Sequence, residues 1–378
     1  MVIKKLIAIS VVFALVAGAA FAADVSGVVI GAVDVASSVK GADAELFGNG
    51  GLGRVRLEAS GEGEIGIGSI GGWIRFDAAN PYAVNIPGGA GSATAMVSGI
   101  AWWQPIEQLR IQLGHSEDGH FDTTHLIRYG FQAQANEIPG LGPRNMWTGV
   151  VGSDNTITSG SKRDVSFSIT PMEGVSINIA FPWDATATGD DTQIANTFKQ
   201  VFFQVNYAAD FGAIHVTYDG VNSSTVMGNF FASAYLGSLV DGLGVEVGAK
   251  FGIAAKNAGK PPLNVGLAVK YDVSEQFGVK FRSLFGIPME SGGKMVMSVD
   301  LLPYYAVNDS VTAFFNIGIS KGADVTFYIN PYVRVGSEWG SAFYAGFYFT
   351  NDNSGDDGAK AANGKSTWGI PIGLIASF

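Results

Sequence analysis

The residues most able to bind a metal lie together in one short segment. They are His115, Glu117, Asp118, His120, Asp122 and His125. Imidazole and carboxylate groups are suitable ligands for divalent transition metals. The histidines, however, recur every five residues, and this spacing matches neither one face of a helix nor one face of a strand. We therefore expect a solvated loop here and no metal site.

Two short motifs resemble signatures of catalysis or nucleotide binding. Residues 318–322 match G-x-S-x-G, but a nucleophile elbow needs a strand-to-helix turn and a later histidine. These residues are expected in a hairpin turn, and every histidine precedes them. Gly364-Lys365-Ser366 ends like a phosphate-binding loop, yet residue 359 is alanine and a strand follows. A barrel-embedded hydrolase would need an outward histidine, whereas His215 is predicted to face inward. We expect no enzymatic activity and no cofactor.

The remaining candidate functional residues are charged side chains that share one face of strand-like segments. Nine basic residues occupy that face: Arg54, Arg56, Arg110, Arg128, Lys250, Lys270, Lys280, Arg282 and Arg334. Three acidic residues share it, namely Glu58, Glu246 and Asp300. The acidic surplus is assigned to loops, at Glu117, Asp118, Asp122, Asp184, Asp190, Asp191, Asp352, Asp356 and Asp357. A basic wall around a water-filled pore favours anions, and acidic loops could reverse that preference.

Positioning these charges on one face requires strands, and most of the chain alternates with a period of two. Apolar residues at 165, 167 and 169 alternate with hydroxyl residues, and apolar residues at 243–251 alternate with glycine or charge. Similar runs recur to the end of the chain. Short connections such as 171–174 and 241–242 alternate with longer polar ones such as 184–195. No segment shows a sustained helical period.

One face stays apolar in every strand-like run, which separates this chain from a soluble β-sandwich or solenoid. Lipid is the solvent that stabilises such a face, and closure of the sheet satisfies its backbone groups. The pattern predicts an all-β fold, a transmembrane antiparallel up-and-down β-barrel of about 18 strands (roughly 16 to 20). A barrel of this size leaves an aqueous channel.

The composition agrees with an exported barrel. Of 378 residues, 47% are apolar, only 15% are charged and 52 are glycine, and the formal net charge is −10. Disordered chains are richer in charge, and an acidic chain is a poor ligand for nucleic acid. No cysteine is present, so disulfides and Cys-ligated metals are excluded.

The first 22 residues read as a cleaved signal peptide. Lys4 and Lys5 precede an apolar run at 6–16, and Ala20-Phe21-Ala22 supplies the small residues of a cleavage site. An uncleaved membrane anchor is the alternative. Residues 23–378 would then form the barrel.

The last strand carries the most specific pattern. Trp368, Ile370, Ile372, Leu374, Ala376 and Phe378 alternate with small or apolar residues, and the chain ends on Phe378. This resembles the C-terminal signature of bacterial outer-membrane proteins, which the barrel-assembly machinery reads. Aromatic residues at predicted strand ends, such as Trp102, Trp103 and Trp339, suit the headgroup level of a membrane.

The connection after the fifth strand is long, and residues 115–162 could be a loop or contain one further strand pair. In general porins, a loop in the corresponding place folds into the lumen, with acidic residues facing a basic wall. That resemblance implies a pore-constricting loop carrying Glu117, Asp118 and Asp122; the alternative is a surface loop. The segment from Trp102 to Phe121 is also similar to stretches of treponemal outer-membrane proteins.

The leading hypothesis is therefore an outer-membrane porin for passive diffusion of small hydrophilic solutes and ions. Its partners would be outer-membrane lipid and the barrel-assembly machinery, and the resemblance to general porins implies a homotrimer. The alternative is a surface-exposed structural or adhesive antigen that uses the barrel as a scaffold. A sugar channel would show an aromatic stripe in the lumen, for which Phe314, Tyr328 and Tyr332 are the inward candidates.

Overall fold

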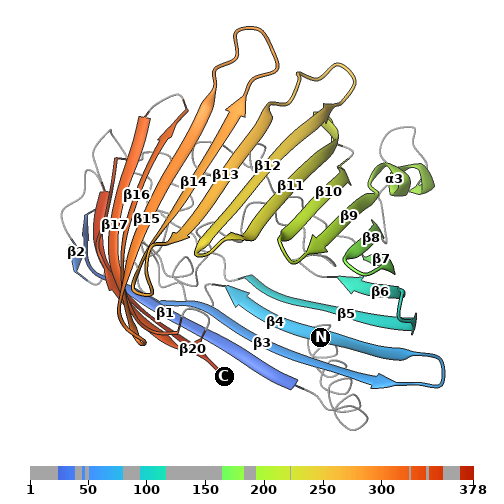
Figure 1. The fold of residues 1–378 in the computed structure, drawn as a ribbon, viewed down its shortest axis with the longest axis horizontal. Helices are drawn as coiled ribbons and strands as arrows, with labels where there is room; N and C mark the ends of the chain where they lie inside the picture. The colour runs from blue at the N-terminus through green and yellow to red at the C-terminus, as the bar shows by residue number, and fades with distance from the viewer. Residues whose placement is uncertain are drawn as a thin grey trace.

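The computed structural model is built almost wholly of β-strands (Figure 1). It describes residues 24–38, 45–46, 51–79, 94–115, 164–182, 193–221, 223–322, 325–337, 340–351 and 367–378. The first strands are β1 (Asp24–Ser38), β2 (Glu45–Leu46), β3 (Gly51–Glu64), β4 (Ser69–Ala79), β5 (Thr94–Ile106), β6 (Leu109–His115), β7 (Val165–Met172), β8 (Val175–Phe181), β9 (Phe202–Ala209) and β10 (Gly212–Gly220). The others are β11 (Val226–Val240), β12 (Leu243–Ala254), β13 (Leu263–Asp272), β14 (Phe277–Ile287), β15 (Val296–Asn308), β16 (Val311–Lys321), β17 (Val325–Gly336), β18 (Ala342–Gly346), β19 (Tyr348–Thr350) and β20 (Thr367–Ser377).

The strands form a closed antiparallel barrel. In Figure 1 they follow one another around the wall in colour order, until red β20 lies beside blue β1. Strand β1 pairs with both β3 and β20, which closes the sheet. Strand β2 pairs with Ala36 and Ser37 near the end of β1 and so extends the position that β3 occupies in the wall. Strands β18 and β19 both lie between β17 and β20 and together occupy one position. Twenty segments therefore make a wall of eighteen strands, which confirms the predicted fold class.

The wall continues directly from the fifth strand, β6, to β7. Leu113 pairs with Val165, and Gln112 pairs with Ser166. No further strand therefore stands between β6 and β7 in the wall. The strand-like run at 127–135 and the predicted constriction loop at 115–162 lie outside the described residues after His115, as does the signal peptide at 1–22.

The period of two in the sequence becomes two chemically different faces. In β12, Glu246 and Lys250 are buried on the inner face, with exposed fractions of 4% and 8%, whereas Val247 and Phe251 are exposed on the outer face. The same alternation runs through β13 to β17. Because successive side chains of a strand point to opposite sides, every wall strand presents one face inward and one outward.

The connections differ at the two ends of the barrel. At one end, here called the turn end, the chain reverses in short turns such as 107–108, 173–174, 210–211, 241–242 and 309–310. At the other end, the loop end, connections include 255–262 and 288–295. This is the up-and-down topology that the alternating connection lengths predict.

Among the described residues there is one helix, α3 (Gln193–Lys199), at the loop end between β8 and β9. Its first three residues fall within the loop predicted at 184–195, because seven residues are too few to show a helical period. Within the described part of the chain, no helix has the length and apolar character needed to cross a membrane.

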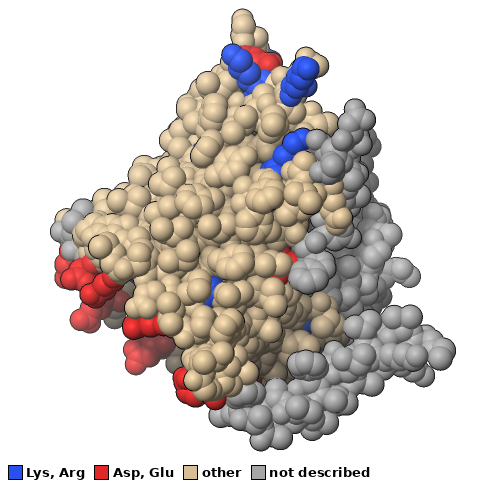
Figure 2. Space-filling model, turned by 90° about the vertical axis from the view of Figure 1, so that its right-hand side faces the viewer, with Lys and Arg blue, Asp and Glu red and all other residues tan. Residues whose placement is uncertain are grey.

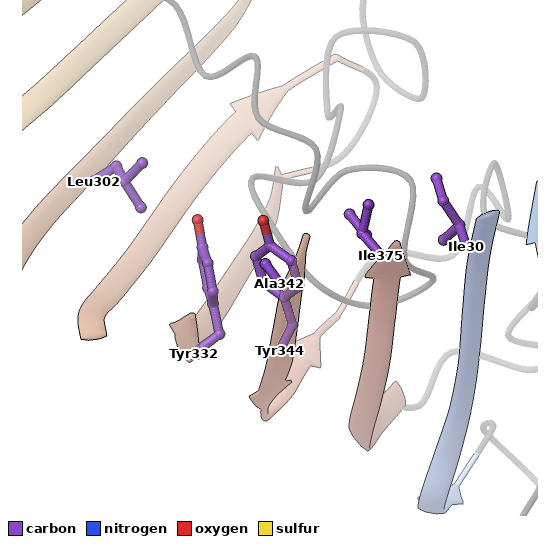
Figure 3. Packing of buried hydrophobic residues seen from close by; sticks show 6 residues of the cluster. All are labelled: Ile30, Leu302, Tyr332, Ala342, Tyr344 and Ile375. Carbon is purple, nitrogen blue, oxygen red and sulfur yellow. The ribbon is translucent and has the colours of Figure 1, made fainter. Parts of the chain in front are cut away.

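One sector of the inner wall is apolar and aromatic. Ile30, Leu302, Tyr332, Ala342, Tyr344 and Ile375 form a buried cluster, with exposed fractions of 6% or less. Figure 3 shows their side chains extending from β1, β15, β17, β18 and β20 on the same side of the wall. Phe314 packs against the cluster and stacks on Tyr332, with ring centroids 4.6 Å apart.

The two ends of the described barrel meet at a seam between β20 and β1. The Gly27 amide donates to the Phe378 carbonyl at 2.7 Å, and the Phe378 amide donates to the Gly27 carbonyl at 3.0 Å. The Phe378 ring lies over Gly27, where a Cβ would overlap it. Phe378 faces outward and is exposed. Its predicted role as an assembly signal stays a prediction.

Candidate functional site: the charged inner wall

Strands β3 and β4 carry a group of alternating charges on the inner wall. The Arg56 guanidinium donates from Nε and Nη2 to Asp77 Oδ2, at 3.0 and 2.8 Å. Arg75 donates from Nε to Glu58 Oε1. The register pairs Arg56 with Asp77 and Glu58 with Arg75. Arg56 and Glu58 were predicted from the sequence, whereas Arg75 and Asp77 were not, although both share the inner face of β4.

A second group lies on β13, β14 and β15. Arg282 donates from Nε and Nη2 to Asp300 Oδ2, at 3.0 and 2.7 Å. The Asp300 side chain has an exposed fraction of 0% and that of Arg282 has 11%. Lys270 lies 2.7 Å from Asp272 Oδ2, and its register neighbour is Lys280. These are four of the predicted wall residues, together with one acid, Asp272, that sequence analysis missed.

A hydrogen-bond chain extends this group across the neighbouring strands. The Tyr328 hydroxyl donates to Asp300 Oδ1 at 3.3 Å, and Asn316 Nδ2 donates to the Tyr328 hydroxyl oxygen at 2.7 Å. All three residues are buried. A buried carboxylate needs both a counter-charge and hydrogen bonds. The hydrogen bonds from Asn316 through Tyr328 therefore hold the Asp300 carboxylate in place, and the carboxylate in turn holds the Arg282 guanidinium.

The other predicted cations whose side chains are described contact aromatic rings. The Arg110 guanidinium lies 4.3 Å from the Trp102 ring centroid and donates twice to Gln104 Oε1, at 3.1 and 2.9 Å. Lys250 Nζ lies 5.8 Å from the Phe231 centroid. Arg334 lies 5.4 Å from the Phe314 centroid. Such contacts hold a cation against the wall without neutralising its charge.

Hydrogen-bonded amides and hydroxyls occupy much of the inner face of β6 to β10. Gln112 donates to Ser166 at 3.2 Å, Ser168 donates to Asn178 at 2.8 Å, and Asn178 donates to Gln204 at 2.9 Å. The chain continues from Gln204 to Thr217, and His215 Nδ1 lies 2.7 Å from Asn206 Oδ1. His215 therefore faces inward, as predicted.

Five predicted residues lie wholly or in part outside the described structure. Arg54 lies in β3 opposite Ile30 and Ala79, but its side chain is outside the described part. Arg128, Glu117, Asp118 and Asp122 lie outside the described residues altogether. Their assignment to the wall and to a constriction loop stays a prediction. In the described part of the chain, no group of three histidines or carboxylates could hold a metal ion.

The motif at 318–322 is part of the wall. Gly318 to Lys321 belong to β16, so the predicted hairpin turn starts later than expected. Ser320 is fully buried, and its hydroxyl is hydrogen-bonded to that of Thr326 on β17. The serine therefore sits in a regular strand pair instead of a strand-to-helix turn.

Within the described part of the inner wall, the charges are more nearly balanced than in the sequence count of nine to three. Its described cations are Arg56, Arg75, Arg110, Lys250, Lys270, Lys280, Arg282 and Arg334. Its described acids are Glu58, Asp77, Asp219, Glu246, Asp272 and Asp300. Eight cations thus stand against six carboxylates.

Solved structures resemble this barrel. No protein-family model matches the sequence, and no curated protein matches it. A doubly substituted porin from Rh. blastica aligns with a TM-score of 0.50 at 12% identity, over 94% of this chain and 100% of that one. A triple mutant of Rhodopseudomonas blastica porin aligns with a TM-score of 0.49 at 12% identity and the same coverage.

The fold is that of a porin-type barrel. At this level of identity the likeness concerns the fold alone. The similarity of the segment from Trp102 to Phe121 to treponemal proteins stays a prediction.

The porin-type barrel has an acidic rim at its turn end, which sequence analysis missed. We define the acidic rim as nine exposed carboxylates at or beside the short turns: Asp24, Glu62, Glu64, Glu107, Glu173, Asp210, Asp241, Glu275 and Asp309. No described turn residue at this end is lysine or arginine. In Figure 2, most of the red side chains lie along the lower left edge, and the larger blue groups lie in the upper part. The signal was available, because most short turns in the sequence contain one acid.

Proposed function

We propose that this chain is a porin, a water-filled channel for passive diffusion of small hydrophilic solutes and ions across an outer membrane. The observation that carries the proposal is the opposite chemistry of the two faces around a closed wall. More than forty large apolar side chains are exposed in the described part of the chain. Leaving them half exposed to water would cost on the order of 40 kcal/mol, far more than the net stability of a folded domain. Lipid removes that cost.

The inner wall supports passage of solutes without a chemical step. It is lined by ion pairs, amides and hydroxyls, and an eighteen-strand barrel is wide enough for an aqueous channel. The paired charges hydrate the pore and set its local field. The proposal therefore assigns no catalytic residue.

We infer the setting of the channel from the same features. An outward apolar face supports a membrane, and the sequence of residues 1–22 supports export through a signal peptide. The C-terminal aromatic strand supports insertion by the barrel-assembly machinery. A homotrimer is part of the proposal on the resemblance to general porins alone.

The ion preference proposed here differs along the pore. The wall alone, with eight cations against six acids, supports little selectivity. The acidic rim attracts cations to the turn end, because exposed carboxylates at a channel mouth raise the local cation concentration. We therefore propose that the current is larger when the turn side is positive, since this voltage drives the accumulated cations into the pore.

Planar-bilayer conductance of the refolded mature chain tests the function. Discrete conductance steps, with a reversal potential near zero in a salt gradient at high ionic strength, are expected. Absence of conductance from a protein that keeps heat-modifiable barrel mobility would refute the channel and favour the scaffold alternative. Free solubility of the folded protein without detergent would refute the membrane setting as well.

A further inference from the structure

Strands β8 and β9 are shorter than a membrane requires. They contain seven and eight residues, as do their neighbours β6 and β7, whereas β12 to β17 contain ten to thirteen. Seven or eight residues extend about 25 Å along a strand and, at a tilt of about 45°, cover about 18 Å of membrane thickness. The apolar band of such barrels is about 25 Å tall. Strands β8 and β9 therefore leave about 7 Å of the band uncovered.

Helix α3 lies where these two strands end. Only Gln200 and Val201 separate it from β9, and the Val201 amide donates to the Phe198 carbonyl at 3.3 Å. The Gly220 amide at the end of β10 donates to the Val201 carbonyl at 3.0 Å. A helix is about 10 Å wide with its side chains, which is enough to fill the missing height.

The helix turns an apolar side outward. Ile194 and Phe198, one turn apart, are 72% and 64% exposed, whereas Asn196 on the opposite side is fully buried. The Phe198 ring meets that of Phe181 edge to face, with centroids 5.9 Å apart. Phe181 is the last residue of β8, on its outward face with Ile177 and Ile179. The apolar surface of the helix therefore continues the outward face of the barrel.

We propose that α3 is an in-plane membrane element, with Ile194 and Phe198 inserted at the boundary between headgroups and acyl chains. The occupant of this surface is lipid. Exposed Lys199 ends the helix, where its ammonium group can reach an anionic headgroup while its stem lies along apolar surface. A short amphipathic helix of this kind sits about 5 to 10 Å into the interface. The inference rests on the proposed membrane setting but not on conduction.

The test uses site-specific labels, since the chain has no cysteine of its own. Single-cysteine variants Ile194→Cys and Phe198→Cys of the full chain are labelled with a nitroxide and folded into phosphatidylcholine–phosphatidylglycerol vesicles. Val247→Cys, on the outward face of β12, serves as the lipid control, and Ser224→Cys, exposed in the connection between β10 and β11, serves as the water control. Accessibility to oxygen in lipid is compared with accessibility to an aqueous nickel complex.

The expected ratio of lipid to aqueous accessibility at residues 194 and 198 is about tenfold above that at residue 224, because acyl chains exclude the polar complex. A ratio of lipid to aqueous accessibility at residues 194 and 198 equal to that at residue 224 would overturn the proposal. Protection from both reagents would also overturn it, in favour of a contact with a second copy of this chain. Aqueous accessibility at residue 247 would instead mark failure of the membrane setting itself.

Discussion

Lys280→Glu is the substitution that most directly tests whether the inner wall sets the ion preference. Lys280 lies on the inner face of β14, beside Lys270 in the register. Neighbouring Arg282 is less suitable, because it is held in a buried ion pair with Asp300. A glutamate at 280 changes the wall charge by two units without breaking that pair.

The size of the effect follows from Coulomb interaction with a passing ion. One unit charge about 10 Å away in water contributes about 0.4 kcal/mol, which screening over one Debye length reduces to about 0.15 kcal/mol at 0.1 M salt. Two units favour the cation by about 0.3 kcal/mol and disfavour the anion by as much. The gap of about 0.6 kcal/mol corresponds to a roughly threefold rise in the cation-to-anion permeability ratio.

The assay is the reversal potential in a salt gradient, measured on single channels in a planar bilayer. At about 0.01 M salt, where the Debye length is about 30 Å, the shift should grow to about sevenfold. Lys256→Glu is the matched control, because Lys256 is exposed in the β12–β13 connection and the charge change is the same. An unchanged reversal potential in Lys280→Glu, or an equal shift in Lys256→Glu, would refute the inward placement of residue 280.

Three further outcomes are expected. Asp300→Asn should lower the free energy of unfolding from vesicles by about 3 kcal/mol, because it leaves Arg282 without its counter-charge in a buried site; a loss under about 1 kcal/mol in urea titration would instead indicate a solvated pair. Gly318→Val should lower single-channel conductance and cost about 2 kcal/mol, since its Cβ would overlap the Tyr328 ring and displace it; wild-type conductance would show that the ring does not move into the pore. Amide substitution of six of the nine acidic-rim carboxylates should reduce the asymmetry of current with voltage at low salt, and equal asymmetry before and after would contradict the field proposed for the rim. The substitutions are Glu107→Gln, Glu173→Gln, Asp210→Asn, Asp241→Asn, Glu275→Gln and Asp309→Asn.

The fold was predictable because, along every barrel strand, side chains that face the pore alternate with apolar side chains that face outward. Alternation identified the strands from β12 to β17, and the even strand number agrees with that of bacterial up-and-down barrels. Helix α3 was not predictable, because seven residues carry no periodic signal. One wall strand is interrupted at Phe347, which separates β18 from β19. This interruption was also not predictable, because the residues around it form a continuous apolar run.

The candidate site was predictable in its residue types but not in its pairing. A strand shows which side chains share a face, so Arg56 and Arg282 were assigned inward from sequence. Their counter-charges come from neighbouring strands, and only the register brings Asp77 to Arg56 and Asp300 to Arg282. The count of nine to three differs from the described wall because it omitted Asp77, Asp219 and Asp272, which share the inner face with the counted residues, as well as Arg75.

The glycines of the inner wall explain how large aromatic rings can lie along the wall instead of extending into the pore. Trp102 lies over Gly71, Tyr304 over Gly278, Tyr328 over Gly318 and Tyr348 over Gly369, each across one strand pair. A Cβ at any of these glycines would overlap the ring. Each ring therefore lies along the wall instead of standing into the barrel, and the neighbouring glycine regains the packing that it lacks on its own. Pairing of charges has the same consequence, because Arg56 and Arg282 reach sideways to carboxylates on adjacent strands. Large side chains and open pore space are compatible only when the next strand provides a place for each side chain to lie.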